Sequence, residues 1–96
     1  MTGKRIRWTL RALRRLDEIG AYIEQDNPEA AARVVVRIVT AVDTLTDLPA
    51  TGRPGRIKGT REIVLTDIPY IIPYRVRRDI EIITVMHAQQ KWPKAF

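Results

Sequence analysis

The chain of 96 residues contains no cysteine and a single histidine, His87. Without cysteine it has no disulfide framework, no thiolate metal site and no cysteine nucleophile, and one histidine argues against a histidine-based zinc site. No apolar run approaches the roughly 18 residues that a membrane-spanning helix needs. The basic N-terminus "MTGKRIRWTL" lacks the continuous apolar stretch and the cleavage site of a signal peptide. We therefore expect a cytoplasmic protein that uses no cofactor and no metal.

The composition that remains is that of a small globular protein with excess positive charge. With 45% hydrophobic and 29% charged residues, residues 1–96 are predicted to form a single domain. The net charge of +6 is unevenly spread, because residues 10–48 carry five basic and seven acidic side chains whereas residues 49–79 carry seven basic and three acidic ones. This asymmetry favours an anionic partner, either a polyanion or an acidic protein segment.

The first half of the chain predicts a short strand followed by two helices. Residues 4–9, "KRIRWT", alternate charged and apolar side chains as a strand does. Thr9 is a suitable N-cap for a helix that ends near Gln25. Asn27, followed by a proline, is a suitable N-cap for a second helix that ends near Leu48. The short connection between the two predicts an αα-hairpin.

The second half changes to the period of strands. A turn-rich connection over residues 49–56, "PATGRPGR", precedes three predicted strands at residues 60–65, 70–76 and 80–87. The whole order predicts an α+β fold, β-α-α-β-β-β, with the helical hairpin packed on a mostly antiparallel sheet. The last strand is apolar on both faces and is expected in the centre. Pro73 cannot donate a ladder hydrogen bond, so its strand must be an edge there or carry a bulge.

The chain also resembles a known family, the RelE/ParE superfamily of type II toxin–antitoxin toxins. The resemblance covers nearly the whole length and rests on four segments in the same order and spacing: "RWTLRALRRLDEIGAYI" with "NPEAAARVV", "LPATGRPGRIKGTREIVL", "YIIPYRV" and "IEIITVMHAQQKWP". It implies the same β-α-α-β-β-β arrangement. It also implies a partner in a plasmid-stabilisation type of module, namely an antitoxin whose C-terminal segment wraps the toxin and silences it.

The superfamily divides into two activities. RelE-like members cut messenger RNA in the ribosome, and ParE-like members poison DNA gyrase. RelE-like nucleases resemble one another in an arginine directly after the aromatic that opens the third strand, where this chain has Ile71 after Tyr70. They tend to end with a catalytic tyrosine or basic residue beyond the last strand, whereas here "AQQKWP" has no tyrosine. The resemblance favours a gyrase inhibitor, with a ribosome-dependent endoribonuclease as the alternative and a non-toxic operon repressor as a third possibility.

An endoribonuclease without metal needs a base, an acid and a cation that stabilises the phosphate. His87 has the chemistry of the acid or base, and Arg61 and Arg75 that of phosphate clamps. Each has a competing structural interpretation, since His87 closes a strand and Arg75 is placed to pair with Glu62 or Glu81 across the sheet. A gyrase inhibitor would be a binding protein rather than an enzyme and would need no proton transfer.

Two contact surfaces are expected. A basic contact surface, which is otherwise a solvated loop, comprises Arg53, Arg56, Lys58 and Arg61. A groove for the antitoxin is expected on apolar surface left by the helical hairpin, and its predicted residues are Trp8, Leu13, Ile23 and Arg75. An acidic antitoxin tail would complement the charge of the toxin and speed association more than strengthen it.

Overall fold

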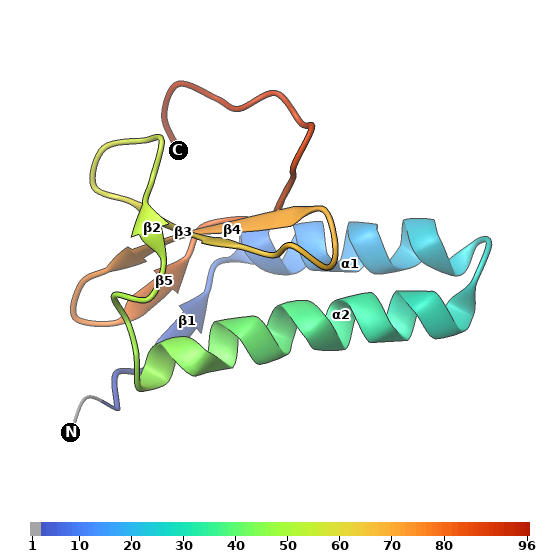
Figure 1. Cartoon of the computed structure of the whole chain (residues 1–96), viewed down its shortest axis with the longest axis horizontal. Coiled ribbons are helices and arrows are strands. Elements are labelled where there is room, and N and C mark those ends of the chain that lie inside the picture. The colour runs from blue at the N-terminus through green and yellow to red at the C-terminus, as the bar shows by residue number, and fades with distance from the viewer. Residues whose placement is uncertain (1–2) are drawn as a thin grey trace.

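The computed structural model of the chain describes residues 3–96. In this part of the chain, two helices pack side by side on one face of a six-stranded sheet (Figure 1). The radius of gyration of 13.1 Å is that of one compact domain of about a hundred residues. Neither helix within residues 3–96 is long and apolar enough to cross a membrane.

The two helices begin where their capping residues predict. Helix α1 (Leu10–Glu24) is capped by the hydroxyl of Thr9, and helix α2 (Pro28–Asp43) by the side-chain carbonyl of Asn27. Each cap accepts a hydrogen bond of 3.0 Å from the backbone N–H of the third helical residue. This bond satisfies a donor that has no partner inside the helix, and both predicted helix starts are confirmed.

The end of the second helix differs from the prediction. We expected it near Leu48, but α2 ends at Asp43 and a 3-10 turn, η1 (Thr44–Thr46), follows. The Thr44 hydroxyl donates to a main-chain carbonyl one turn earlier at 2.7 Å, which is how threonine competes with helical hydrogen bonds. Leu45 is still fully buried, so the apolar stripe continues while the helix tightens.

The strands form a sheet in the order β1-β5-β4-β3-β2, and β6 also pairs with β4. Their bounds are β1 Ile6–Trp8, β2 Arg53–Pro54, β3 Arg61–Val64, β4 Tyr70–Val76, β5 Ile80–Ile82 and β6 Met86–His87. Only the pairing of β1 with β5 is parallel among the described strands. The α+β arrangement with a mostly antiparallel sheet is therefore confirmed, and β5 lies inside the sheet as expected.

The predicted continuous strand over residues 80–87 is wrong, because a bulge divides it into β5 and β6. Both halves pair with β4, but residues 83–85 lie opposite only Ile72 and Pro73. The extra residue bends the strand next to the proline, which has no N–H for the ladder. The Ile83 N–H donates to the Pro73 carbonyl at 3.0 Å. A bulge is present as Pro73 suggested, but it lies in the opposite segment, whereas β4 itself pairs on both sides and carries no extra residue.

The connection over residues 49–56 is more ordered than its turn-rich sequence suggests, because it contains the short strand β2 beside β3. The hydroxyl of Tyr74, a core residue, fixes this connection by two hydrogen bonds. It donates to the Pro49 carbonyl at 2.9 Å and accepts from the Gly52 N–H at 2.9 Å. A Cβ on Gly52 would lie 2.5 Å from that hydroxyl, so the close approach requires glycine.

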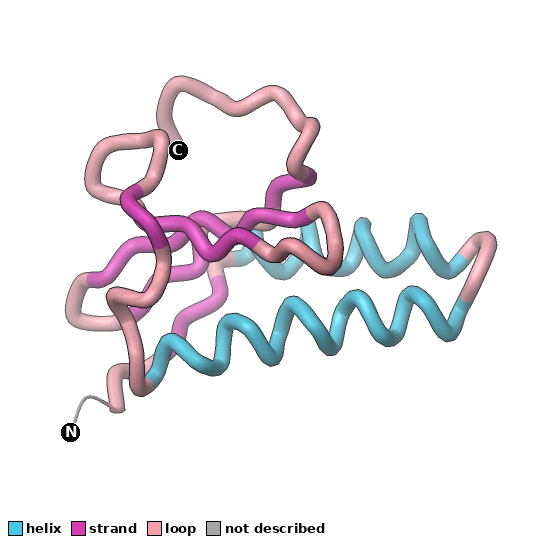
Figure 2. Tube along the Cα trace, in the orientation of Figure 1, coloured by secondary structure: helices cyan, strands magenta, loops and turns pink. Residues whose placement is uncertain are grey.

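Alternation along the strands separates two faces of the sheet. Trp8, Ile82 and Tyr74 lie in register across β1, β5 and β4 and pack in the core beneath the helices. Their neighbours Arg7, Glu81 and Arg75 therefore point to the opposite face. After β6 the C-terminal segment, residues 88–96, runs on the side of the sheet away from α2 (Figure 2).

Candidate functional site

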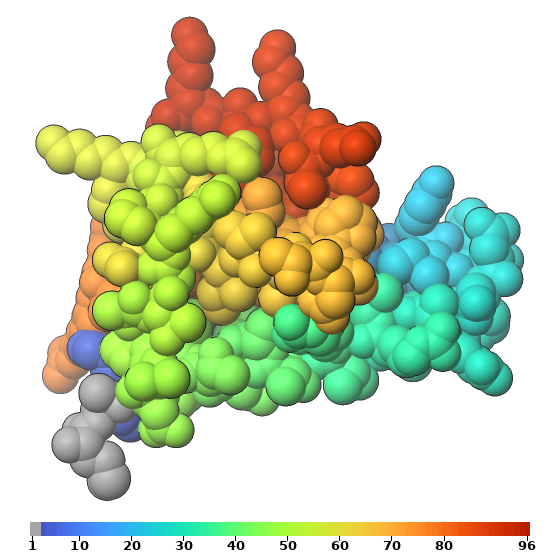
Figure 3. All heavy atoms as spheres, viewed as in Figure 1, coloured from blue at the N-terminus to red at the C-terminus, as the bar shows by residue number. Residues whose placement is uncertain are grey.

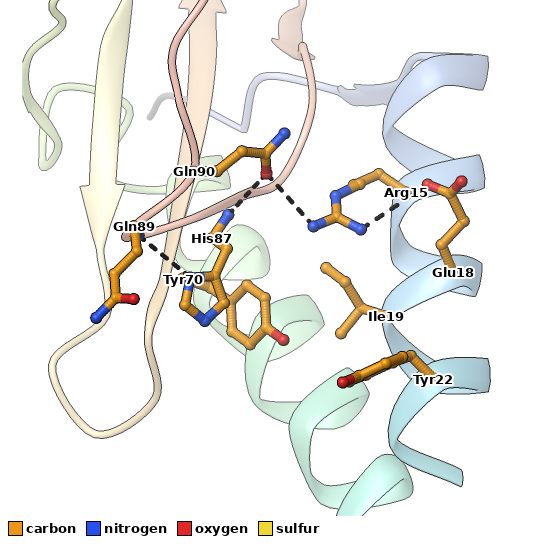
Figure 4. Close-up of a pocket in the computed structure, with 8 residues that line it drawn as sticks. All are labelled: Arg15, Glu18, Ile19, Tyr22, Tyr70, His87, Gln89 and Gln90. Carbon is orange, nitrogen blue, oxygen red and sulfur yellow. Dashed lines mark hydrogen bonds and ion pairs between the residues drawn. The ribbon is translucent and has the colours of Figure 1, made fainter. Parts of the chain in front are cut away.

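A hollow of the described surface lies between α1 and the end of β6. It has a volume of about 560 Å³, and Figure 4 shows its walls. Helix α1 contributes Arg15, Ile19 and Tyr22 from one face, since these residues recur at spacings of three and four. The sheet contributes Tyr70 and His87, which lie in register on β4 and β6.

His87 is held in this hollow by three contacts. Its ring packs edge-to-face on Tyr70 with centroids 5.4 Å apart. Its Nδ1 accepts a hydrogen bond of 3.1 Å from the Gln89 N–H, and its own backbone N–H donates to Gln90 Oε1 at 3.2 Å. An imidazole nitrogen that accepts carries no proton, so the ring proton of the neutral form lies on Nε2. In this arrangement neither nitrogen is placed as a free general base.

Arg75 and Arg61 lie at the other end of β4. Arg75 donates to Glu81 Oε1 at 3.1 Å, one of the two carboxylates expected for it. Arg61, in register with Tyr74, donates to the main-chain carbonyls of residues 52 and 50 at 3.0 and 3.1 Å. Both guanidinium groups are thus engaged by the protein.

The three candidate catalytic side chains do not converge on one site. His87 is in register with Tyr70, at the first residue of β4, and Arg75 is the sixth residue of the same strand. Five steps at about 3.3 Å place these ends roughly 16 Å apart. Arg75 also points to the face away from the helices, whereas Tyr70 belongs to the core on the helical side.

The four residues of the predicted basic contact surface differ in what their side chains contact. Arg53 forms an ion pair with Glu62, whose side chain is fully buried, and Arg61 is bound to carbonyls. Arg56 stacks over the ring of Trp92 at 4.2 Å, and Lys58 is exposed at the tip of the loop. Figure 3 shows this loop in yellow against the red C-terminal segment. Arg53, Arg56 and Lys58 are all exposed to solvent, and contact of this surface with a partner stays a prediction.

The four residues predicted for an antitoxin groove lie on different surfaces. Trp8 and Ile23 pack against the core and are partly buried. Leu13 is 44% exposed on α1, and Arg75 lies in the ion pair on the opposite face of the sheet. They do not line one continuous groove. Their role in antitoxin binding stays a prediction.

Sequence reasoning missed Arg15, Tyr22 and Gln90 as neighbours of His87. The signal for the first two was the spacing of seven residues, which puts them on one face of α1 beside the buried Ile19. Nothing in the local sequence pointed to Gln90, because its contacts depend on how the chain turns after β6.

Comparison with known proteins agrees with this fold. The chain matches the family of the ParE toxin of the type II toxin–antitoxin system parDE over residues 6–92. It is 77% identical over 94 residues to "Putative toxin Y4kP" of Sinorhizobium fredii, with 98% of each chain covered. It is 40% identical over 82 residues to Toxin RelE2 of Caulobacter vibrioides, covering 84% of this chain and 91% of the relative.

Among solved structures, a chain of a chromosomal ParDE TA system from P. aeruginosa has a TM-score of 0.84 at 28% identity. The match covers 93% of this chain and 100% of that one. The fold and these matches together define a toxin of the RelE/ParE superfamily. Within it the chain belongs to the ParE toxin family and is the toxin of a type II toxin–antitoxin module, a class that implies an antitoxin partner.

Proposed function

We propose that this toxin inhibits DNA gyrase in the cytoplasm by binding to it, and that a cognate antitoxin neutralises it. The observation that carries the proposal is the separation of His87 from the two predicted phosphate clamps. His87 lies in register with the first residue of β4, whereas Arg75 is the sixth residue of that strand and Arg61 lies in register with the fifth. RNA cleavage requires the proton-transferring group and the cation to meet at one phosphate. Binding to a protein target has no such requirement.

The engagement of each group supports the same proposal. The Nδ1 of His87 is occupied by the Gln89 N–H, and the two arginines are bound to Glu81 and to main-chain carbonyls. A group that must first break an internal hydrogen bond is poorly preorganised for catalysis. A binding surface can use these same residues to keep the sheet rigid.

The alternative is ribosome-dependent cleavage of messenger RNA. It is favoured by the 40% identity to Toxin RelE2 and by the hollow itself, where Arg15, Tyr70 and His87 lie together. In that mechanism Arg15 would take the role of the phosphate clamp. The rings of Tyr22 and Tyr70, which line the same hollow, would be the surfaces on which bases stack.

The first experiment is a timed induction of the toxin alone in bacterial cells, with DNA synthesis and messenger-RNA integrity followed together. A gyrase inhibitor stops replication and induces the DNA-damage response while transcripts stay whole. Purified toxin should then inhibit gyrase supercoiling and trap cleaved DNA. Transcripts that are cut within minutes, before DNA synthesis falls, would establish the endoribonuclease instead.

The toxicity of the variant His87→Ala distinguishes the two mechanisms. A gyrase inhibitor is expected to keep toxicity within about threefold, since no proton transfer is lost, whereas loss of a general acid or base lowers a rate about 10²–10⁴-fold. Gln25→Ala, at the exposed end of α1, is the control. Circular dichroism of both proteins shows whether a loss of toxicity reflects unfolding.

A further inference from the structure

The corner of the sheet at which the chain enters β1 carries most of the net charge. Residues 4–7 and 75–81 together hold six basic side chains and two acidic ones, a local charge of +4 out of +6 for the whole chain. These segments are far apart in the sequence, and the parallel pairing of β1 with β5 brings them together. We call this surface the basic corner. Charge gathered in this way attracts anions to one part of a protein.

Backbone contacts fix the two segments of the basic corner against each other. The Ile80 N–H donates to the Arg5 carbonyl at 2.8 Å, which ties the residue before β1 to the start of β5. Lys4 Nζ donates to the Arg77 carbonyl at 2.8 Å, and Figure 3 shows the orange β4–β5 turn beside blue atoms of the first residues. The turn is closed by the Arg77 N–H, which donates to the Asp79 carbonyl at 2.9 Å. The backbone positions that carry the cations are therefore fixed before a partner binds.

Three arginines of the basic corner have no internal partner. The side chains of Arg5, Arg77 and Arg78 are exposed and form no hydrogen bond or ion pair with any group in residues 3–96. Asp79, which follows them in the turn, is partly exposed and offsets one of the three charges. A guanidinium group that the protein does not engage keeps all its donors for a ligand, and its fork geometry suits a phosphate.

The sheet beside the turn adds a charged row. Arg7, Glu81 and Arg75 lie in register across β1, β5 and β4, so the two arginines are separated by two strand spacings, or about 10 Å. Glu81 pairs with both arginines, and 53% of the Arg7 side chain stays exposed. The row therefore keeps one excess positive charge on an open face of the sheet, outside the hollow beside His87.

The composition of the basic corner indicates which kind of anion it suits. Residues 4–7 and 75–81 include no aromatic residue, whereas single-stranded nucleic acid is held largely by stacking on aromatic rings. A protein partner needs an apolar anchor near the centre of its interface, and the apolar Val76 is only 38% exposed. A row of phosphates needs neither feature, because arginines on an open surface bind it through charge and hydrogen bonds. The backbone of a nucleic-acid duplex is the best complement.

We propose that the basic corner binds the phosphate backbone of double-stranded DNA without reading its sequence, through Arg5, Arg77 and Arg78. The choice of DNA over duplex RNA rests on the proposed function, because an inhibitor of gyrase acts beside the DNA that gyrase holds. Contact with this DNA adds to the contact with the enzyme and raises the affinity for the complex of the two. The tests use toxin and nucleic acid without gyrase, so their failure is distinct from a failure of gyrase inhibition.

The first test measures binding of the purified toxin to a short labelled DNA duplex by fluorescence anisotropy at several salt concentrations. Three phosphate contacts predict that the logarithm of the binding constant falls with the logarithm of salt concentration with a slope of about −2.7. Arg77→Gln with Arg78→Gln should weaken binding about tenfold or more at low salt and reduce the slope to about −0.9. An unchanged slope for this double variant overturns the proposal.

A matched pair of substitutions separates the local surface from the net charge. Arg14→Gln with Arg33→Gln removes the same two charges from exposed positions on α1 and α2, and should leave the affinity for DNA within about twofold of the parent protein. If both double variants weaken binding equally, binding follows net charge alone and the proposal is overturned. Thermal unfolding of the two variants checks that each remains folded.

The last test changes the ligand. A DNA duplex of scrambled sequence should bind within about twofold, since phosphate contacts carry no sequence information. Single-stranded RNA and polyglutamate of equal total charge should compete more weakly than the DNA duplex. Polyglutamate that competes as well as DNA assigns the basic corner to an acidic protein segment and overturns the proposal. An RNA duplex that binds several-fold more tightly than DNA overturns the choice of DNA.

Discussion

The two ends of β4 differ in how their polar groups are satisfied. At the Arg75 end, charged side chains pair with one another: Glu81 lies between Arg7 and Arg75, and the buried Glu62 is bound to Arg53. At the Tyr70 end, Arg15 bonds to the Val85 carbonyl, and Gln90 bonds to the backbone of His87 through both its side chain and its backbone N–H, beside an open hollow. The comparison teaches that a concentration of arginines marks no binding surface by itself. A surface ready for an anionic partner also needs cations that no group of the protein engages.

The largest expected effect tests the charged end of β4. Glu62→Gln removes a buried charge whose Oε1 accepts from Arg53 at 2.9 and 3.0 Å and whose Oε2 accepts from the Arg56 N–H at 2.9 Å. We expect the free energy of unfolding to fall by about 2–3 kcal/mol, below the effect for a fully buried pair because Arg53 is half exposed. Glu81→Gln is the control and should lower it by less than about 1 kcal/mol. Urea unfolding measures both, and equal losses would show that burial does not distinguish these two carboxylates.

A smaller effect compares the same substitution at both ends of the strand. Tyr74→Phe removes a buried hydroxyl that accepts from the Gly52 N–H and donates to the Pro49 carbonyl. The free energy of unfolding should fall by about 1–2 kcal/mol, because a buried donor and acceptor lose their partner. Tyr70→Phe, at the other end, should change it by less than about 0.5 kcal/mol. If Tyr70→Phe is the more destabilising of the two, the Tyr70 end is more tightly packed than we describe.

The smallest effect concerns the ion pair between Arg37 of α2 and Asp67, which lies shortly before the Tyr70 end of β4. Hydrogen bonds from Arg37 at 2.7 and 3.1 Å hold the pKa of Asp67 below its ordinary value of 3.8. A carboxylate with a lowered pKa in the folded state stabilises the fold above its unfolded pKa, and this contribution is lost as pH falls through the folded pKa. The stability difference between the parent and Asp67→Asn should therefore be present at neutral pH and vanish in strong acid.

Both groups of this pair are exposed, so added salt should reduce the same difference. Asp17→Asn, exposed on α1, is the control and should show no comparable pH dependence. Thermal unfolding across the acid range measures both. A difference that persists in strong acid would mean that Asp67 acts through its shape rather than its charge.

Local patterns predicted much of the fold. These patterns depend on residues that are close together in the sequence. They are the helix caps at Thr9 and Asn27, the alternation in three strands, and the conflict between Pro73 and a continuous strand ladder. The strand β2 and the end of α2 were not predicted. The first exists because β3 and the Tyr74 hydroxyl hold it, and the second depends on how Leu45 enters the core.

The candidate site was predicted less well, for a related reason. His87 was recognised as the end of a strand, but Arg15 and Gln90 meet beside it across 75 residues of sequence. The basic cluster looked free of acids because Glu62 follows it, yet the pairing of β2 with β3 puts that carboxylate against Arg53. Charge counts along a chain do not report such pairings.

The sequence by itself determined the order of helices and strands and membership in the toxin family, because both depend on short-range periodicity and on motifs in a fixed order. The tertiary structure alone decided which arginines are engaged and which residues surround His87. Those outcomes arise from strand register, from the bulge opposite Pro73 and from the path of the chain after His87. Each of these brings together residues that no local pattern connects.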